Sequence, residues 1–513
     1  MSEEEFHRRL IQAILSGEIE DKAALQKAKV RLARELHLSR LPANSEVIER
    51  LDEASFRKVE DILKRKPVRT LSGVAVVAVM TSPAPCPHGR CIYCPGGVDN
   101  GSPQSYTGKE PAARRASFNE FDPARQTRAR IEQLEAIGHD TDKIDLIVMG
   151  GTFTSRPVDY QRGFVQGCFD AMNERSSDDL EQAHHHNESA PHRCIGMTVE
   201  TRPDSFDQAM ADHVMSLGTT RMEFGVQILD EAILRAVGRG HGVEEVVRAT
   251  QVAKGHGLKV CYHVMPGLPG SSPELDLERF ALMFQDERFM PDMLKIYPTL
   301  VVKGTPLYDM WCRGEYEPYG TENAAHVVAE MKRLVPRWAR IQRIQRDIPV
   351  QLIEAGVDKS HLRELARDEL RSRGISCHCI RCREVGLKGI RRFEREEVQF
   401  SDVHYQASQA VERFLSFDLP GPDALVAYLR LRLGPGDRAQ VRELKVFGQM
   451  ARIGQEGKDA QHRGFGRGLM AHAESLAKDE GYAEMAVTSG VGVRSYYATL
   501  GYSRQGPYMV KRL

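Results

Sequence analysis

A chain of 513 residues is too long for one ordinary hydrophobic core, so we expect two or three domains, which its 41% hydrophobic content can fill. Lysine plus arginine and aspartate plus glutamate number 71 each, so the net charge is zero and a nucleic-acid partner must be met by a local basic face. The acidic opening MSEEEFHRRL, and the lack of any run near the roughly 18 apolar residues of a membrane helix, predict a cytoplasmic protein without secretion signal or membrane span.

Residues 1–70 are expected to form helices. The stretches LAREL and VIERLDEASFRKVEDILKRK repeat apolar residues at helical spacing, and Pro42, Asn44 and Ser45 supply a helix start. We take this helical segment as the first domain.

Between residues 71 and 304, short apolar runs alternate with helical stretches. The runs cover residues 72–80, 143–151, 194–201, 221–229, 258–265 and 293–302. Six strands alternating with helices predict an α/β domain built as a parallel, partial TIM-like barrel, whose active site lies at the C-terminal ends of the strands. At these ends the sequence has a cysteine cluster after the first run, Gly150 and Gly151 after the second, and Glu200 in the third.

The rest of the chain divides at about residue 398. Residues 305–398 predict an arginine-rich, irregular linker with a second cysteine cluster, and residues 399–513 predict a second α/β unit. The polar stretch 176–192 is expected to be a surface loop or an exposed helix, and its histidines His184, His185 and His186 are not expected to hold a metal.

Ten cysteines in a large cytosolic chain need an explanation other than disulfides. Cys86, Cys91 and Cys94 have the spacing C-x4-C-x2-C, and three thiolates on one loop can hold three irons of a 4Fe-4S cluster. The fourth iron is then open to a small molecule, as in radical S-adenosylmethionine (SAM) enzymes, although their usual loop is one residue shorter. The alternative is a zinc site that lacks a fourth ligand or takes His88.

The second cluster consists of Cys377, Cys379 and Cys382 in the linker. With Cys312 as a fourth ligand they predict a closed, structural zinc site that pins the linker. His378 is another possible fourth ligand, and ordinary buried cysteines are the alternative to any metal.

A glycine turn in the last unit predicts an anion site. The turn lies between a strand and a helix, so its backbone N–H groups and the helix dipole can face a pyrophosphate. The pattern resembles the acetyl-CoA site of GNAT-type acetyltransferases through Gln461, Gly464, Phe465 and Gly466. That resemblance implies that the strand edge Arg442, Glu443, Leu444 and Lys445 pairs with the pantetheine arm. It also implies that Tyr496 or Tyr497 contacts the thioester sulfur as a catalytic residue, with core packing as the alternative.

The two halves together resemble the catalytic subunit of the Elongator complex. The motifs that carry the resemblance are CPHGRCIYCPGG, SYTGKEP, LIVMGGTF, VETRPD, LKIYPTLV, IQRDIP, GFGRGLM and GPYMVKRL, and they run from about residue 70 to the C-terminus. The family works as a stand-alone enzyme in prokaryotes and as one subunit of an assembly in eukaryotes. The cluster loop has four residues between its first two cysteines instead of the nine of eukaryotic members, and the Cys377 set is absent from some relatives.

The resemblance implies a tRNA carboxymethyluridine synthase, an acyltransferase that uses a 4Fe-4S cluster, SAM and acetyl-CoA. A deoxyadenosyl radical would take hydrogen from the acetyl methyl, the carbon radical would add to carbon five of the wobble uridine, and thioester hydrolysis would leave a carboxymethyl group. Lys143 would reach acetyl-CoA from the barrel side, unless it is only an exposed lysine before a strand. An electron donor is required. The chain is expected to act alone or as a homodimer, or with Elongator-type partner subunits if its source is eukaryotic.

Two basic stretches are expected to contact tRNA phosphates, with a solvated helix face as the alternative. The residues are Lys27, Lys29, Arg31 and Arg34 in the first stretch, and Arg337, Arg340 and Arg343 in the second, where Trp338 could stack on a base. Two rival functions remain open: a protein lysine acetyltransferase with a vestigial iron–sulfur half, and a non-enzymatic tRNA-binding scaffold. Intact cysteines argue against the first rival, and the complete acetyl-CoA motif argues against the second.

Overall fold

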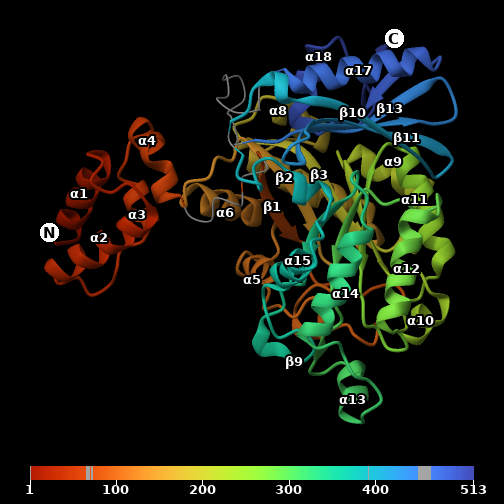
Figure 1. Cartoon of the computed structure of the whole chain (residues 1–513), viewed down its shortest axis with the longest axis horizontal. Coiled ribbons are helices and arrows are strands. Elements are labelled where there is room, and N and C mark those ends of the chain that lie inside the picture. Colours follow the sequence, from red (N-terminus) through yellow and green to blue (C-terminus); the bar gives the residue numbers. More distant parts are fainter. Residues whose placement is uncertain (1, 65–69, 71–72, 391, 449–463) are drawn as a thin grey trace.

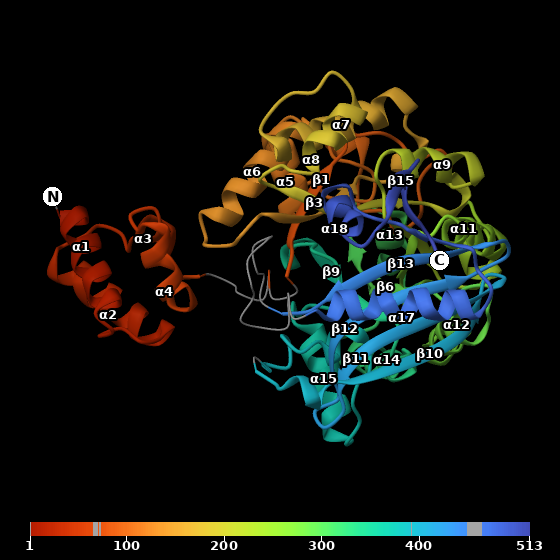
Figure 2. The same ribbon diagram turned by 90° about the horizontal axis from the view of Figure 1, so that it is seen from above.

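The computed structural model describes residues 2–64, 70, 73–390, 392–448 and 464–513 (Figure 1). Four helices form a separate N-terminal group: α1 (Ser2–Leu15), α2 (Lys22–Glu35), α3 (Asn44–Ile48) and α4 (Glu53–Leu63). Their apolar faces enclose a core of their own, with Phe6, Leu10 and Leu63 fully buried. The group lies to one side of the rest of the molecule in Figures 1 and 2, which confirms the helical N-terminal segment.

Side-chain caps fix the starts of two of these helices. Asp21 accepts a hydrogen bond from the Ala24 N–H before α2, and Asp52 accepts one from the Ser55 N–H before α4. The group is tied to the barrel by Arg57, whose guanidinium Nη1 lies 3.1 Å from Asp140 Oδ2.

Seven parallel strands form the predicted partial barrel, in the order β1-β2-β3-β4-β5-β6-β8. They are β1 (Ala75–Met80), β2 (Lys143–Met149), β3 (Arg193–Thr201), β4 (Arg221–Gln227), β5 (Lys259–Val264), β6 (Met293–Ile296) and β8 (Arg340–Ile344). The first six strands coincide with the runs predicted from the sequence, although β3 begins one residue earlier than its run. The seventh, β8, comes from the basic stretch expected to be irregular, and it pairs in parallel with β6. The predicted linker therefore contributes a strand to the barrel.

Helices cover the outside of this sheet, because each buries an apolar face and leaves a polar face in water. They are α5 (Pro111–Phe118), α6 (Pro123–Glu135), α7 (Val158–Asn173), α8 (Leu180–Asn187), α9 (Gln208–Ser216), α10 (Glu231–Ala236), α11 (Val243–Gly255), α12 (Pro273–Gln285), α14 (Thr321–Leu334) and α15 (Leu362–Ser372). The three histidines lie in helix α8, so this part of the stretch forms the helix, rather than the loop, of the two predicted alternatives. His184 is buried there, with its ring 4.6 Å from that of Phe169.

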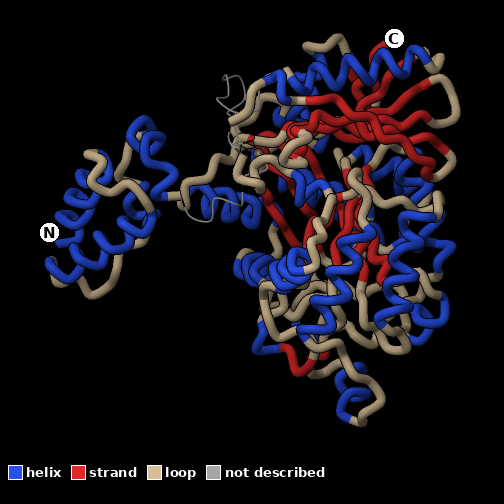
Figure 3. Tube along the Cα trace, viewed as in Figure 1, coloured by secondary structure: helices blue, strands red, loops and turns tan. Residues whose placement is uncertain are grey.

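The second sheet has the order β10-β11-β12-β13-β14-β16-β15. Figure 3 draws the strands of the chain in red and its helices in blue. The strands of the second sheet are β10 (Gln399–Ala407), β11 (Ala410–Leu419), β12 (Ala424–Leu433), β13 (Arg438–Val446), β14 (Glu484–Val487), β15 (Ser503–Gln505) and β16 (Tyr508–Arg512), with helices α17 (Phe465–Asp479) and α18 (Arg494–Ala498). Only β13 and β14 pair in parallel; the other described pairs are antiparallel. Its strands and helices form the second α/β unit predicted for residues 399–513.

The second sheet docks against the N-terminal ends of the barrel strands. A Cβ on Gly490 would lie 2.1 Å from Ile195 O, and one on Gly492 would lie 2.5 Å from Arg193 Cβ, so glycine is needed for this contact. One continuous hydrophobic core includes residues of both sheets, such as Phe224 and Leu429. The barrel and the second sheet are therefore packed as one body.

Short elements complete the described chain. They are α13 (Pro306–Cys312), α16 (Ile380–Arg383), the strand pair β7 (Val301–Val302) and β9 (Ile353–Ala355), and the 3-10 helices Val98–Asn100, Phe153–Ser155, Pro203–Ser205, Val350–Leu352, Arg395–Glu397 and Val491–Val493. Among the described residues, no helix has the length and apolar character needed to cross a bilayer.

Candidate active site

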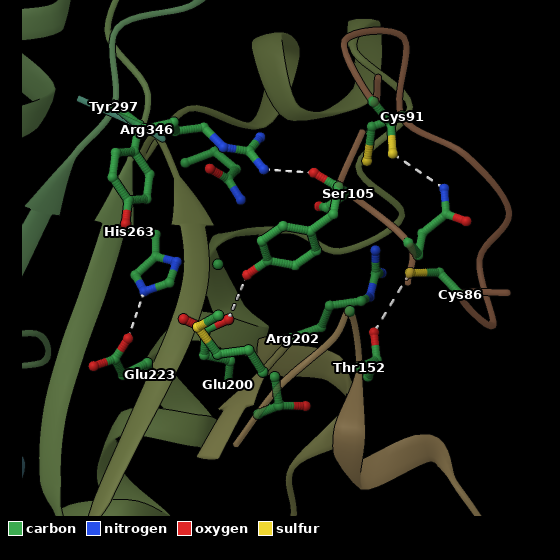
Figure 4. A pocket seen from close by; sticks show the side chains of 18 of the residues that line it. Cys86, Cys91, Ser105, Thr152, Glu200, Arg202, Glu223, His263, Tyr297 and Arg346 are labelled. Atoms are coloured by element: carbon green, nitrogen blue, oxygen red, sulfur yellow. Dashed lines mark hydrogen bonds and ion pairs between the residues drawn. The ribbon is translucent and has the colours of Figure 1, made fainter. Parts of the chain in front are cut away.

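A pocket of about 140 Å³ opens at the C-terminal ends of the barrel strands (Figure 4). The cysteine loop after β1 lines one side, and the ends of β3, β4, β5 and β6 supply charged side chains on the other. Gly151 and Thr152, after β2, also line it. Gly150 has a φ of 126°, and a Cβ there would lie 2.2 Å from Thr81 Oγ1, so the turn after β2 requires glycine.

The three cysteines of the loop face this pocket. Cys91 and Cys94 are buried and Cys86 is half-buried. Each sulfur has a polar neighbour: Thr152 Oγ1 at 3.6 Å from Cys86, His88 Nε2 at 3.2 Å from Cys91, and Gln104 Nε2 at 3.0 Å from Cys94. Burial raises the pKa of the Cys86 thiol and lowers the pKa of His88 to about 4.

The two cysteine sets differ in how closely their sulfurs are grouped. Tetrahedral zinc with Zn–S bonds of about 2.3 Å holds its sulfurs roughly 3.8 Å apart. Among the described residues, Cys377, Cys379 and Cys382 have sulfurs within 4.8 Å of one another, whereas the first three cysteines form no such tight group. Cys86, Cys91 and Cys94 are not held as close together as the ligands of one zinc ion would be, and a 4Fe-4S cluster does not require them to be.

A buried charge network forms the floor of the pocket. Lys295 Nζ lies 3.0 Å from Glu200 Oε1 and also contacts Glu223, while His263 Nε2 lies 2.9 Å from Glu223 Oε2. The Tyr106 hydroxyl donates to Glu200 Oε2 at 3.1 Å. Burial alone would raise the pKa of Glu223, but the neighbouring Lys295 ammonium holds it well below its usual range. The predicted Glu200 thus belongs to a cluster of charged side chains held by Lys295 and Tyr106.

The second cysteine set is close enough to share one ion, but without its predicted fourth ligand. Cys312 lies exposed on α13, outside the tight group of Cys377, Cys379 and Cys382. His378 is engaged elsewhere, with its Nδ1 3.0 Å from Asp423 Oδ2. The prediction of Cys312 as a zinc ligand is therefore wrong in geometry, because α13 belongs to another part of the fold.

Among the described residues, none pairs with the part of the β13 edge where pantetheine was predicted to pair. Its parallel pairing with β14 covers only Arg438–Val441, and a register shift against β12 makes Arg442 an extra residue. The Arg442 side chain is fully buried in ion pairs, so only its backbone can face a ligand. The pairing of β14 with β13 ends at Val487, opposite Val441. The backbone from Arg442 to Lys445 therefore lies beyond the end of this pairing.

The start of α17 lies beside this edge. Gly464 has a φ of 83°, which suits glycine, and a Cβ on Gly466 would lie 3.0 Å from the Tyr496 hydroxyl and 3.8 Å from Leu444 Cδ2. Phe465 is buried, and the predicted Gln461 lies outside the described residues.

The two candidate tyrosines occupy different environments. The Tyr496 side chain is 38% exposed beside the start of α17, whereas Tyr497 is buried at 6% and its ring lies 6.2 Å from that of Tyr502. Burial raises the pKa of both phenols. Only Tyr496 combines a position at the turn with access to a bound molecule.

Lys143 opens β2 at the end of the barrel that meets the second sheet. It is paired in register with Arg193, the residue against which Gly492 packs, and α18 with Tyr496 follows Gly492 by two residues. Burial lowers the pKa of Lys143. The lysine is therefore not a freely exposed residue before a strand.

The predicted tRNA residues are only partly on the surface. Lys27, Arg31 and Arg34 are exposed on α2, but Lys29 is buried and donates to Asn44 Oδ1 at 2.8 Å. In the second stretch, Arg337 is exposed and pairs with Asp423. The prediction for Arg340 needs correction, because its guanidinium is buried and its Nη2 lies 3.0 Å from Glu384 Oε2.

Trp338 is not available to stack on a base, because it is buried and stacked on Tyr405 with ring centroids 4.0 Å apart. Both exceptions, Arg340 and Trp338, arise because this stretch enters the barrel through β8. Arg343 and its neighbour Arg346 instead line the mouth of the cysteine pocket.

Comparison with known proteins decides the family. Models of the radical SAM superfamily, the radical SAM C-terminal domain and the ELP3 N-terminal domain match residues 82–281, 291–372 and 4–71, respectively. The tRNA uridine(34) acetyltransferase of Methanocaldococcus infernus is 48% identical over 98% of both chains, and human Elongator complex protein 3 is 41% identical over 99% of this chain and 96% of that one. The chain belongs to the Elongator complex protein 3 family.

A solved structure agrees with this membership. The Methanocaldococcus infernus Elp3 with an N-terminal deletion (1–46) covers 86% of this chain, with 46% identity and a TM-score of 0.76. As a member of the family, the chain is an enzyme, and its radical SAM domain implies a 4Fe-4S cluster and SAM. The predicted family and fold are confirmed, and the domain model for residues 291–372 includes β8, in agreement with its place in the barrel.

Several residues that line the pocket were not identified from the sequence pattern. Glu223, His263 and Lys295 are single charged residues within apolar strands, and their meeting depends on the register of β4, β5 and β6. Tyr106 and Gln104 lie in or beside the SYTGKEP motif, which contributed to the family resemblance but received no role. A search for charged residues near the C-terminal ends of the predicted strands would have found the first three.

Proposed function

We propose that this chain is a tRNA carboxymethyluridine synthase that modifies carbon five of the wobble uridine with the acetyl group of acetyl-CoA. The observation that carries the proposal is the joining of two sites on one rigid body: a three-cysteine pocket at one end of the barrel, and an open β13 edge on the sheet docked at the other end. Relatives of nearly full coverage are named tRNA uridine(34) acetyltransferases.

In the barrel, Cys86, Cys91 and Cys94 would hold the cluster, and Gly150, Gly151 and Glu200 would border the SAM site. When bound, the cluster and SAM supply one-electron chemistry that can remove hydrogen from an unactivated carbon. The Lys295 ammonium pairs with Glu200 and holds the pKa of the buried Glu223 below its usual range, although burial alone would disfavour the charged form of Glu223. These fixed charges would orient the polar parts of the cofactor and the base. An external electron donor completes the requirements.

In the second sheet, the backbone of Arg442, Glu443, Leu444 and Lys445 would pair with pantetheine, and the N–H groups at Gly464, Phe465 and Gly466 would face the pyrophosphate. Gln461 would belong to the same turn. Tyr496 would place its hydroxyl at the thioester sulfur, and Lys143 would reach acetyl-CoA from the barrel side. Tyr497 would support Tyr496 by packing.

For tRNA, we propose phosphate contacts by Lys27, Arg31 and Arg34 on α2, by Arg337 just before β8, and by Arg343, which lines the pocket. These side chains are exposed or line the pocket, which supports their assignment. A cytoplasmic location accompanies a tRNA substrate. The chain would act alone or as a homodimer, or with Elongator-type subunits in a eukaryotic source.

We also propose a structural zinc at Cys377, Cys379 and Cys382. The other two thiols, as hydrogen-bond donors, hold the pKa of the buried Cys379 well below its usual value, which favours the thiolate that zinc requires. Metal analysis of a Cys379→Ser variant should show one zinc fewer than the parent, while Cys312→Ser should keep it. Equal zinc loss in both variants would contradict the assignment.

The function is tested with anaerobically reconstituted protein, SAM, acetyl-CoA, a low-potential reductant and unmodified tRNA. Mass spectrometry of digested tRNA should show carboxymethyluridine, which disappears with Cys91→Ser. Acetylated protein lysines with unchanged tRNA would instead support the lysine acetyltransferase alternative.

A further inference from the structure

The segment between the cysteine loop and α5 folds back over the cluster pocket. The Ser102 hydroxyl donates to Tyr106 O at 2.7 Å, and Arg346 donates to Ser105 O at 2.5 Å, so the segment is held at both the loop and the barrel. Within it, Gln104 is buried at 8% exposure and lines the pocket.

The Gln104 amide is aimed at a cysteine sulfur. Its Nε2 lies 3.0 Å from Cys94 Sγ and 3.2 Å from Gly96 O. The carbonyl can only accept, so the nitrogen rather than the oxygen of the amide must face this side. The Cys94 sulfur stands in for the iron-bound thiolate, which has no proton and can only accept as well. The orientation of Gln104 is therefore determined by both partners.

Glycines on two motifs make room for this one side chain. Gly97 has a φ of 138°, and a Cβ there would lie 2.3 Å from Gln104 Oε1. A Cβ on Gly151 would lie 3.2 Å from Gln104 Cβ. The end of CPGG and the end of LIVMGG thus both lack side chains where Gln104 passes. This arrangement gives the SYTGKEP region a role that the proposed function leaves open.

We propose that Gln104 is a positioning residue for the 4Fe-4S cluster: its amide donates to the Cys94 thiolate, orients that ligand and raises the reduction potential of the cluster. Reduction adds negative charge that is shared by the sulfurs, and an N–H dipole aimed at a sulfur stabilises the reduced form more than the oxidised form. Arg239 is another N–H donor to a cysteine of the loop, with its Nη1 3.7 Å from Cys91 Sγ. The distance of 3.0 Å between Gln104 Nε2 and Cys94 Sγ is shorter.

The inference rests on the cluster assignment within the proposed function, but its test needs neither tRNA nor acetyl-CoA. The full chain is reconstituted with iron and sulfide, its iron content is measured, and the cluster is titrated by electron paramagnetic resonance at controlled potentials. Gln104→Met fills the space without a donor, and Gln104→Glu replaces the donor with a charged acceptor. Gln161→Met is the control, because Gln161 is also buried and its amide donates to backbone, at Arg156 O (2.8 Å) and Thr154 O (3.4 Å).

Gln104→Met should lower the ratio of reduced to oxidised cluster about tenfold at a fixed potential, which is about 59 mV for a one-electron couple. Gln104→Glu should lower it further, and Gln161→Met should match the parent. An unchanged midpoint in Gln104→Met with full iron content, or an equal shift in Gln161→Met, overturns the inference.

A second measurement covers the case in which the variants do not retain the cluster. The parent protein, labelled with ¹⁵N at glutamine side-chain amides, should show a ¹⁵N hyperfine coupling to the reduced cluster in pulsed resonance spectra. Absence of such a coupling also overturns the inference. A cluster that titrates as expected in a protein that leaves tRNA unmodified would sink the proposed function alone.

Discussion

Asp292, just before β6, and Arg442, the extra residue of β13, form an ion pair with both side chains fully buried between the barrel and the second sheet. Arg442 Nη1 lies 2.9 Å from Asp292 Oδ2 and also donates to Leu258 O at 2.7 Å, while its Nε donates to Glu412. Burial alone would raise the pKa of Asp292, but Arg442 holds it well below its usual range. The barrel therefore fixes the bulge at which the proposed acetyl-CoA strand leaves its neighbour.

Asp292→Asn should destabilise the chain strongly. It removes one negative charge from a buried cluster in which Arg430 and Lys254 also face Asp292, and breaking such a pair costs about 3–5 kcal/mol. Denaturant unfolding measures the effect. The control is Glu315→Gln, which breaks an exposed pair with Arg313 and should cost about 0–1 kcal/mol. Similar small losses in both variants would show that the interface pair does not hold the sheet to the barrel.

Acidification should weaken the fold through His184. Burial lowers the pKa of His184 to about 4, whereas an unfolded histidine titrates near 6.5. The unfolded chain therefore binds the proton more tightly, and stability should fall as the pH drops from about 6.5 to about 4, by ~3 kcal/mol from this residue.

The pH test uses two variants on one helix. His184→Gln keeps an N–H that can reach Leu217 O, to which His184 Nε2 lies at 3.2 Å, but it cannot be protonated. Its stability should depend less on pH between 6.5 and 4 than that of the parent. His185→Gln, at an exposed position, should follow the parent curve. Parallel curves for His184→Gln and the parent would argue against a neutral, buried His184.

Removal of the Tyr496 hydroxyl should slow the acetyl-CoA-dependent reaction without unfolding the protein. The hydroxyl lies at the start of α17 on a half-exposed side chain, so Tyr496→Phe should reduce the rate about a hundredfold if the group acts on the thioester. Tyr497→Phe keeps the buried packing and should change the rate by no more than about twofold. Steady-state rates of modified tRNA formation give the comparison. The reverse ranking would assign the role to Tyr497.

Exchange of exposed charges on α2 should change the salt dependence of tRNA binding. Lys27→Gln with Arg34→Gln removes two cations, so the slope of log affinity against log salt should fall by about 1.8 if both contact duplex phosphates. Lys29→Met should leave the slope unchanged, because the Lys29 ammonium is buried against Asn44. Filter binding over a salt series measures the slopes. An unchanged slope in the double variant would place the tRNA elsewhere.

The sequence predicts the parts of the site that depend on local pattern. Cys86, Cys91 and Cys94 share one loop, and Gly150 and Gly151 follow a clear apolar run, so spacing alone identifies them. The helical start of the chain and the alternation of strands and helices are local signals as well, and both are confirmed.

The spacing of residues along the sequence does not predict which side chains of a basic stretch are buried. Lys29, Arg340 and Trp338 lie in basic stretches, but a charge run does not say which side chains find buried partners such as Asn44 and Glu384. Cys312 precedes the second cysteine set by 65 residues in the chain, and only the tertiary fold shows that α13 carries it elsewhere. The place of Lys295 in the pocket could not be predicted either, because it depends on the register of the neighbouring strands.

The most direct test of the central claim follows the hydrogen atoms of the acetyl methyl group. Acetyl-CoA with a trideuterated acetyl group is supplied with SAM and tRNA, and both products are analysed by mass spectrometry. Hydrogen abstraction from the acetyl methyl should leave one deuterium in 5′-deoxyadenosine and two in the carboxymethyl group on uridine. Unlabelled 5′-deoxyadenosine together with deuterated, modified tRNA would contradict hydrogen abstraction from the acetyl methyl and require another route to the carbon–carbon bond.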